Sequence, residues 1–482
     1  MFWRTIGGNQ MKVVGREKEK AALKQYYESG VPEFLAVYGR RRIGKTFLIR
    51  EYFEGKLTFY VTGLANGKKE EQLQAWNMAI AKNFDGSDER ATNWLDAFSL
   101  LEGKLEKLNK SKRKILFIDE APWMDTPKSG FLTALEHFWN GWASGRTDIF
   151  LIICGSATSW VVNNLLRDRG GLHNRVTRRM RLLPFTLKEA EAYLEEKEFD
   201  LGRYRLCETY MIFGGVPYYL SLLGKGLSLP QNVDALCFAD DGSLRTEFLE
   251  VYSTLYKNSG NYIKVVTALS KKTKGLTRDE IIQETGLTSG GGLSRILEEL
   301  ELCGFIRVYP NYSLDENLSI YQLADSFSLF HLRFMRGKRP KNPRFWTSNL
   351  ESPALTAWKG YAFEQVCLSH AEQIKQALGI ATISTEISSW RSRQVSPGAQ
   401  IDLLIDRKDG IVNLCEMKYS MAEYVITARE EAALRNKIAV FGTETCTHKA
   451  LHLTMVTTYG VSRNSHSGIV HSEVTMDGLF TI

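Results

Sequence analysis

Eight consecutive residues, Gly39 to Thr46 (GRRRIGKT), have the types and spacing that bind a triphosphate. Glycines let backbone N–H groups wrap phosphate oxygens, and the helix expected to follow adds its N-terminal dipole. We expect Lys45 to reach the β- and γ-phosphates and Thr46 to hold Mg²⁺. The remaining nucleotide-binding positions of the loop are Gly39, Arg40, Arg41, Arg42, Ile43 and Gly44. The pattern predicts a site for ATP and Mg²⁺.

Two acids follow a short apolar run in KILFIDE, residues 114–120. Asp119 is the expected contact to Mg²⁺, directly or through water, and Glu120 is the candidate base that orients the attacking water. A second apolar run, IFLIICGS, ends at Ser156, whose hydroxyl is placed to sense the γ-phosphate or its water. These residues favour hydrolysis of the nucleotide over binding alone.

An arginine-rich segment, LRDRGGLHNRVTRRMRLLPF, follows Ser156. An arginine that stabilises transition-state charge can accelerate hydrolysis by a factor of about 10³ to 10⁵. Arg175 is our candidate for this role because it precedes the last strand expected in this region. The alternative is that these arginines form a solvated or DNA-facing surface.

A second set of acids lies in QIDLLIDRKDGIVNLCEMKY, residues 400–419, whose two apolar runs predict a β-hairpin. If the loop is Lys408 to Gly410, with glycine in the left-handed conformation, Asp402 faces Glu416 across the strands. Lys418 shares their face of the sheet. Two carboxylates held this close repel each other unless a divalent cation neutralises them.

A third acid, Glu364, lies on an apolar stripe of the helical segment TAWKGYAFEQVCLSHAEQIKQAL and needs a partner there. Mg²⁺, or Mn²⁺ in its place, can deliver hydroxide to a phosphodiester when carboxylates hold it, while a lysine stabilises the developing charge. We therefore predict Glu364, Asp402 and Glu416 as metal ligands and, with Lys418, as catalytic residues. The alternative is a surface hairpin with a Glu–Lys pair.

The elements that must position these residues follow the alternation of apolar runs and helical stretches, typical of parallel strands joined by crossover helices. The strands expected up to about residue 185 are Phe34 to Tyr38, Leu57 to Val61, Lys114 to Ile118, Asp148 to Cys154 and Met180 to Leu183. A helical stretch follows to residue 256. A basic connector, residues 336–349, precedes a further α/β region to residue 482.

Residues 257–335 show two helices, a glycine-rich turn and two short strands, which is the order of a winged helix. The second helix would read DNA, but its outward positions include Glu298, Glu299 and Glu301 beside Arg295, and carboxylates repel phosphates. We therefore favour a structural or docking role for this helix over base-specific reading.

The 482 residues correspond to about three domains at roughly 100–200 residues each. A net charge of +7 permits contact with nucleic acid without requiring it. Seven scattered cysteines suit a reducing compartment, and no apolar run has the length of a membrane span or an export signal, so we expect a cytoplasmic protein without membrane contact.

Several motifs together resemble the archaeal-type AAA+ ATPase family, a branch similar to the signalling STAND NTPases; they are GREKE (from Gly15), GRRRIGKT, FIDEAPW, CGSATSW, LHNRVTRR with LLPF, and FGGVPYYL. The resemblance implies a P-loop AAA+ core over residues 12–185, a helical lid over 186–256 and a winged helix over 257–335. It places Arg16 in the box before the first strand, Ser156 at the first sensor and Arg175 in the arginine-finger region. FGGVPYYL lacks a second sensor arginine.

The pattern E…(Q)ID…ExK resembles the PD-(D/E)xK nuclease superfamily, so residues 350–482 are expected to form an α/β restriction-endonuclease-like domain. The favoured hypothesis is an ATPase coupled to a metal-dependent DNA nuclease, with homo-oligomers formed through AAA+ contacts as an open alternative to a monomer. The rival hypothesis is a STAND-like regulatory ATPase whose C-terminal domain binds nucleic acid or protein without cleaving it.

Overall fold

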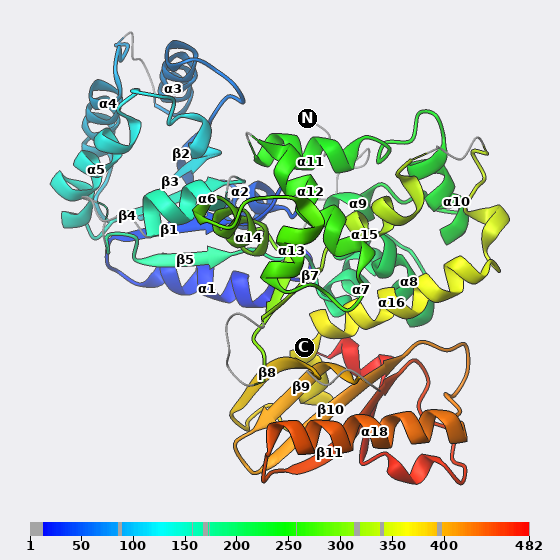
Figure 1. The fold of residues 1–482 in the computed structure, drawn as a ribbon. Coiled ribbons are helices and arrows are strands. Elements are labelled where there is room, and N and C mark those ends of the chain that lie inside the picture. Colours follow the sequence, from blue (N-terminus) through cyan, green and yellow to red (C-terminus); the bar gives the residue numbers. More distant parts are fainter. Residues whose placement is uncertain are drawn as a thin grey trace. The chain divides into compact units, whose positions relative to one another are not determined.

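The computed structural model describes residues 13–84, 89–156, 158–166, 172, 174–256, 258–312, 319–337, 342–392 and 398–481. The chain forms two compact units, which meet in the sequence between Leu183 and Pro184 (Figure 1). None of the helices in these described ranges has the length and apolarity needed to span a lipid bilayer.

The first unit is built on five parallel strands in the order β2-β3-β4-β1-β5. Their bounds are β1 Glu33–Tyr38, β2 Leu57–Thr62, β3 Lys114–Asp119, β4 Ile149–Gly155 and β5 Arg178–Arg181. Four strands lie within a residue or two of the prediction. The fifth was predicted two residues too late, because Arg178 already pairs with Leu35 of β1 and its guanidinium binds Glu33 at 3.0 Å.

Both faces of this sheet are buried, as expected of parallel strands between crossover helices. Along β1, Phe34 and Ala36 face one apolar core and Leu35 and Val37 face another. The helices of this unit are α1 Glu17–Glu28, α2 Lys45–Tyr52, α3 Lys69–Asn83, α4 Trp94–Glu106, η1 Ala121–Trp123, α5 Phe131–Gly141, η2 Ala143–Gly145, α6 Thr158–Val161 and η3 Val162–Leu166.

The second unit begins with the helical stretch expected after residue 185. Its helices are α7 Leu187–Glu196, α8 Gly202–Phe213, α9 Pro217–Ser221, α10 Leu229–Val233, η4 Asp234–Phe238 and α11 Glu247–Leu255. These helices share one apolar core with the segments that follow them in the second unit. Their assignment as a nucleotide lid stays a prediction.

A group of helices and a two-stranded ladder comes next, which we call the helix–hairpin module, residues 259–323. It comprises α12 Ser259–Lys271, α13 Arg278–Thr285, α14 Gly291–Leu302, β6 Ile306–Tyr309 and β7 Ile320–Leu323, with β6 and β7 antiparallel. The predicted capping box is present, since the Thr277 hydroxyl accepts from Glu280 N and the Glu280 carboxylate accepts from Thr277 N. The identification of this module as a winged helix stays a prediction.

The C-terminal part contains a mixed five-stranded sheet in the order β12-β11-β10-β9-β8. Strands β8, β9 and β10 are antiparallel neighbours, whereas β10, β11 and β12 run parallel. The elements are α15 Ser326–Phe330, η6 His331–Met335, η7 Thr347–Asn349, α16 Pro353–Ser369, α17 Ala371–Ala377, β8 Thr385–Arg391, β9 Gln400–Arg407, β10 Ile411–Lys418, α18 Ala428–Thr445, β11 Ala450–Thr457, η8 Ser467–Ile469, β12 Ser472–Thr475 and η9 Met476–Phe480. Helix α18 covers one face of the sheet (Figure 1).

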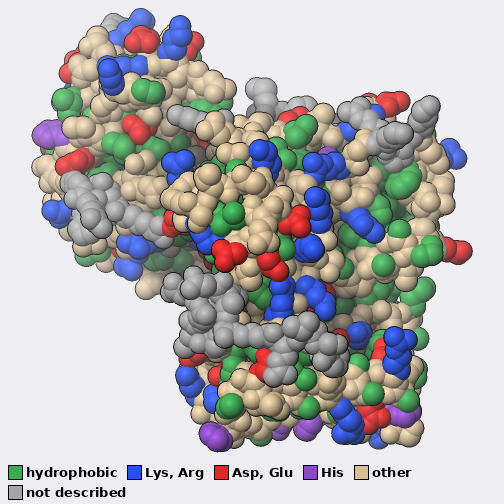
Figure 2. All heavy atoms as spheres, in the orientation of Figure 1, with side chains coloured by type: hydrophobic (Ala, Val, Ile, Leu, Met, Phe, Trp, Pro, Cys, Tyr) green, Lys and Arg blue, Asp and Glu red, His purple; other side chains and the backbone are tan. Residues whose placement is uncertain are grey.

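One face of the molecule carries charged side chains of both signs (Figure 2). On the face drawn in Figure 2, Lys and Arg side chains lie among Asp and Glu side chains and form no single basic stripe.

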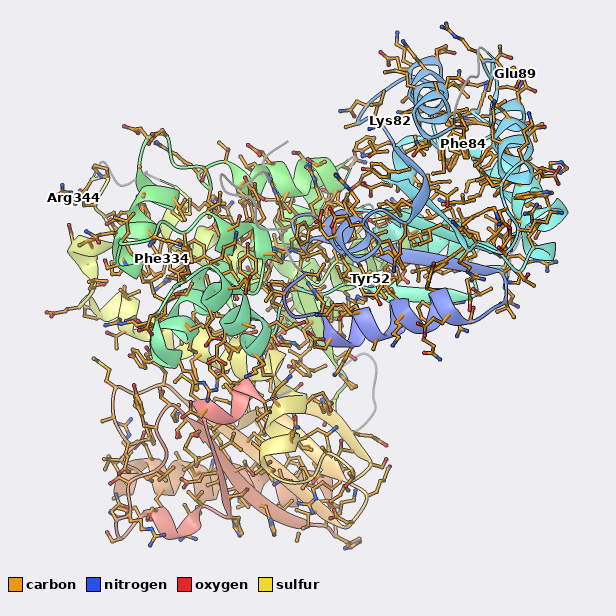
Figure 3. The ribbon with its side chains drawn as sticks, turned by 180° about the vertical axis from the view of Figure 1, so that it is seen from behind. Tyr52, Lys82, Phe84, Glu89, Phe334 and Arg344 are labelled. Carbon is orange, nitrogen blue, oxygen red and sulfur yellow. The ribbon has the colours of Figure 1, made fainter. Side chains whose placement is uncertain are left out.

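The connector predicted over residues 336–349 is anchored in its second half rather than free. Trp346 is buried and packs edge-on against Phe334 and Trp358, with ring centroids 5.1 and 5.8 Å away. Phe334 points in among the helices of the second unit, whereas Arg344 lies at the surface (Figure 3). Composition suggested an extended linker because it could not show the aromatic rings that pack against Trp346.

Candidate functional site

The loop Gly39 to Thr46 connects β1 to α2, as the motif requires. Gly39 has a φ of 144°, and a Cβ at this position would lie 2.3 Å from the Leu182 carbonyl oxygen. Gly44 caps α2 with a φ of 86°, and Arg42 also has a positive φ of 72°. These conformations turn the backbone into a loop ahead of the N-terminus of α2, which is the kind of site that binds anions.

Lys45 is buried at the centre of this loop. Its ammonium group donates to the carbonyl oxygens of Gly39 at 2.7 Å and Arg40 at 2.8 Å, and to the Ser156 hydroxyl at 3.2 Å. The structure therefore brings together Lys45 and Ser156, which are 111 residues apart in the sequence. A cation held by carbonyl dipoles inside a loop of this shape is placed to meet phosphate oxygens.

Thr46 and Asp119, the two residues predicted to contact Mg²⁺, lie next to each other. The Thr46 hydroxyl donates to the Asp119 carboxylate at 2.8 Å. Burial, together with the negative charge of Glu120, raises the pKa of Asp119 to about 6, although the hydrogen bond from Thr46 acts in the opposite direction. A bound cation would favour the charged carboxylate, so this pair has the chemistry of a Mg²⁺ site beside the phosphate loop.

Glu120 is held in the left-handed conformation, with a φ of 47°. Its carboxylate accepts hydrogen bonds from the Ser156 backbone N–H at 3.1 Å and from the Ser156 hydroxyl. Close packing fixes the backbone here, because a Cβ on Gly63 would lie 2.5 Å from the Glu120 carbonyl oxygen. The candidate base and the candidate sensor are thus a hydrogen-bonded pair.

Two predicted arginines differ in their positions. Arg16 precedes α1 and donates to the Ile43 carbonyl oxygen at 3.3 Å, so the box before the first strand contacts the phosphate loop. Arg175 has an exposed side chain, and its backbone N–H donates to Leu172 O at 3.0 Å. Its role as an arginine finger stays a prediction. Arg167 and Arg169 lie outside the described residues.

The C-terminal hairpin has the loop and register that the sequence predicted. Strand β9 ends at Arg407 and β10 begins at Ile411, with Gly410 at a φ of 89°. The ladder pairs Leu403 with Cys415, and the next position along it brings Asp402 opposite Glu416. One face of the hairpin therefore carries both acids.

Both oxygens of Glu416 are taken up by lysines. Lys418 approaches one oxygen at 2.9 Å, and Lys437 of α18 approaches the other at 2.7 Å. Burial alone would raise the pKa of Glu416, but these two ammonium groups hold it below its usual value. Sequence reasoning missed Lys437. The signal was available, because Lys437 lies between Leu434 and Phe441 on the buried stripe of α18.

The other two acids have pKa values shifted upward. Burial, then the charges of Asp402 and Glu416, raises the pKa of Glu364 well above its usual range. Burial, then the charge of Glu416, raises the pKa of Asp402 as well, against the hydrogen bond that it accepts from Gln400 at 2.7 Å. The Tyr361 hydroxyl, one helical turn before Glu364, is buried and has no hydrogen-bond partner among the described residues.

The metal prediction for Glu364, Asp402 and Glu416 is not realised as a ready-made centre. In the described ranges, no group of three or more His, Cys, Asp or Glu side chains is placed to hold a metal ion. The physical reason lies in the lysines, which occupy the oxygens of Glu416 that a cation would use. We call this group the acid–lysine cluster; its members are Glu364, Asp402, Glu416, Lys418 and Lys437. Metal binding there stays a prediction.

The first site lies in a part of the chain that matches a known protein family. Residues 13–223 match the family described as an ATPase domain predominantly from Archaea. The chain carries an archaeal-type P-loop ATPase domain. The protein is similar to an uncharacterized protein, MJECL04, of Methanocaldococcus jannaschii, with 26% identity over 401 residues that cover 81% of this chain and 83% of the relative.

Solved structures show weaker likenesses to this ATPase. The Walker-type ATPase paby2304 of Pyrococcus abyssi has 18% identity and a TM-score of 0.49, covering 68% of this chain and 99% of its own. The ORC2 protein of Aeropyrum pernix has 14% identity and a TM-score of 0.42, covering 68% of this chain and 95% of its own. Both are distant, so the ATPase assignment rests on the family match and on the phosphate loop.

Proposed function

We propose that this protein is a Mg²⁺-dependent ATPase in which Lys45, Thr46, Asp119, Glu120 and Ser156 form the hydrolytic site. The observation that supports it most is the convergence of these side chains at the carboxyl ends of β1, β3 and β4. Ligands of open α/β sheets bind at this edge.

Each residue has a role set by its contacts. Lys45, now held by two loop carbonyls, would turn to the β- and γ-phosphates. Thr46 and Asp119 would hold Mg²⁺, which when bound supplies positive charge against the phosphate oxygens. Glu120 would orient the attacking water, and Ser156 would restrain Glu120 until the γ-phosphate competes for the serine hydroxyl.

ATP turnover by the purified protein tests this proposal. Lys45→Ala should weaken ATP binding, and Glu120→Gln should bind ATP yet hydrolyse it about 10²-fold more slowly or worse, the range expected for loss of a general base. Lys24→Ala, which changes an exposed lysine on α1, is the matched control. Turnover that survives unchanged in Glu120→Gln would remove the assigned base.

A second candidate function is ATP-controlled cleavage of DNA by the C-terminal cluster. The specific support is the hairpin register, which places Asp402 and Glu416 on one face with Lys418, near Glu364. Mg²⁺ or Mn²⁺ would fit only after Lys418 or Lys437 leaves Glu416, so no metal-dependent step follows from the present arrangement. The alternative is a regulatory ATPase whose C-terminal domain binds nucleic acid or protein without cleaving it.

Incubation of the full-length protein with plasmid DNA and Mg²⁺, with and without ATP, separates these alternatives. Cleavage that disappears in Glu416→Gln would support a nuclease. Retention of the plasmid on the protein without nicking would support the binding role. The ATPase proposal includes homo-oligomers in which Arg175 reaches the nucleotide of a neighbouring subunit. Light scattering in the presence of ATP tests for such oligomers.

A further inference from the structure

The helix–hairpin module is joined to the edge of the C-terminal sheet by main-chain contacts. The segment after β6 lies beside β8, where Ser389 N donates to Pro310 O at 3.3 Å and Tyr312 N donates to Ser389 O at 3.2 Å. Asn311 and Ser389 form a parallel β-bridge. The module therefore extends the sheet at β8. Strand β8 neighbours β9, and β9 carries Asp402.

Arg391, the last residue of β8, connects the helix–hairpin module to the acid–lysine cluster. All three nitrogens of its guanidinium group form hydrogen bonds. One terminal nitrogen donates to the carbonyl oxygens of Lys274 at 3.2 Å and Gly275 at 3.0 Å. The other approaches the Glu280 carboxylate at 3.2 Å. The Nε–H donates to the Gln400 side-chain oxygen at 3.2 Å. A planar fork with this many bonds has a single orientation.

Gln400 relays this contact to Asp402. Its amide nitrogen donates to Asp402 at 2.7 Å and to the Lys274 carbonyl oxygen at 3.1 Å, while its oxygen accepts from Arg391. Both amide hydrogens and the oxygen are therefore used, and Gln400 is buried. The bond to Gln400 fixes one carboxylate oxygen of Asp402.

The turn that receives these bonds is itself rigid. Gly275 has a φ of 74°, and a Cβ there would lie 2.4 Å from a methyl carbon of Ile320 on β7. Leu276 exchanges two main-chain hydrogen bonds with Tyr321 of the same strand. The position of the Lys274 carbonyl oxygen is thus set by the β6–β7 hairpin and not by the turn alone.

We infer that Arg391 and Gln400 are positioning residues through which the helix–hairpin module sets the orientation of Asp402 in the acid–lysine cluster. The chemistry of that cluster rests on the second candidate function given above, but the coupling does not. A ligand that moves the module, such as a nucleic-acid strand on its exposed Lys271, Lys272 and Lys274, would release Asp402 from Gln400. The module is therefore a control element for the cluster.

Carbodiimide labelling of the full-length protein, mapped by peptide mass spectrometry, tests the coupling without requiring any enzymatic activity. Gln400→Leu removes the amide bond to Asp402, and Arg391→Gln removes the bonds that fix Gln400. Glu280→Gln removes the charge that binds Arg391 from within the module. The glutamine side-chain oxygen can still accept from Thr277 N. Each change should alter the labelling rate of Asp402 about threefold or more, as expected for loss of one hydrogen bond.

Arg407→Gln is the matched control. Arg407 lies on β9, the strand that carries Gln400 and Asp402, but its guanidinium binds Asp409 at 2.8 Å. Its Asp402 labelling should equal that of the wild type. Unchanged Asp402 labelling in Arg391→Gln and Glu280→Gln would overturn the inference, whereas a change in both, with retained thermal stability, supports it. Failure of the wild type to cleave DNA would remove the nuclease proposal and leave this labelling result to decide the coupling.

Discussion

At the residue scale, the hydrogen-bonded pair of Glu120 and Ser156 decides how the ATPase site is held before hydrolysis. Ser156→Ala removes the hydroxyl that binds both Glu120 and Lys45 and keeps the backbone N–H on Glu120. We expect kcat for ATP to fall about tenfold, with KM changed less than about threefold, because a misplaced base affects the chemical step more than binding. Steady-state kinetics measure both values. An unchanged kcat would show that Ser156 does not act through Glu120.

The sequence predicted most of these residues because their contacts are local to motifs. A glycine loop between a strand and a helix dictates where Lys45 and Thr46 lie, and hairpin geometry alone sets Asp402 against Glu416. The sequence places Lys437 beside the buried stripe of α18, but its pairing with Glu416 depends on how α18 packs on the sheet. Arg391 and Gln400 act through a module more than a hundred residues earlier in the chain, which no local pattern reveals.

At the element scale, Asp234 anchors the connector that the sequence predicted as a linker. Its carboxylate accepts from Trp346 N at 2.7 Å, from Thr347 N at 3.1 Å and from the Thr347 hydroxyl. Asp234→Ala leaves the buried donor of Trp346 unpaired and should lower the free energy of unfolding by about 2–4 kcal/mol. Urea denaturation measures this change. Asp240→Ala, which removes a carboxylate fully exposed in its pair with Arg245, should change stability little.

A buried histidine joins α16 to the start of α7 and makes the second unit sensitive to acid. His370 Nε2 accepts from Leu187 N at 2.9 Å, and its Nδ1 lies 2.8 Å from Val366 O, so the ring is neutral and donates from Nδ1. Burial lowers the pKa of His370 from 6.5 to about 4. As the pH falls below 6.5, the unfolded chain takes up the proton first. The contribution of neutral His370 to the free energy of unfolding is therefore complete above pH 6.5 and is lost towards pH 4.

The free energy of unfolding should fall by about 3 kcal/mol through His370, at about 1.4 kcal/mol per pKa unit. His370→Gln keeps a donor and an acceptor but cannot titrate. Its urea midpoint should therefore fall less between pH 7 and pH 4.5 than that of the wild type, and equal pH profiles for the two proteins would contradict the assignment. No pattern in the sequence indicated this contact, since His370 and Leu187 lie 183 residues apart.

At the scale of the whole molecule, the chain combines an ATPase unit with a second unit in which helices, module and C-terminal sheet share one apolar core. The sequence divided this second unit into a lid, a winged helix, a linker and a nuclease-like domain. Helices and strands follow one another along the chain in the expected order, whereas the four domain assignments stay predictions. Trp346, Arg391 and His370 make contacts between the segments that were assigned to different domains.

Control of the C-terminal site by ATP can be tested with two single variants and their combination. If ATP hydrolysis governs DNA cleavage, Lys45→Ala should reduce both activities. Glu416→Gln should abolish cleavage and leave ATP turnover within about twofold of the wild type, since the two sites share no residue. The double variant should lose both. Cleavage in Lys45→Ala at the wild-type rate, with and without ATP, would mean that the two units work separately. The nucleotide would then regulate something other than the acid–lysine cluster.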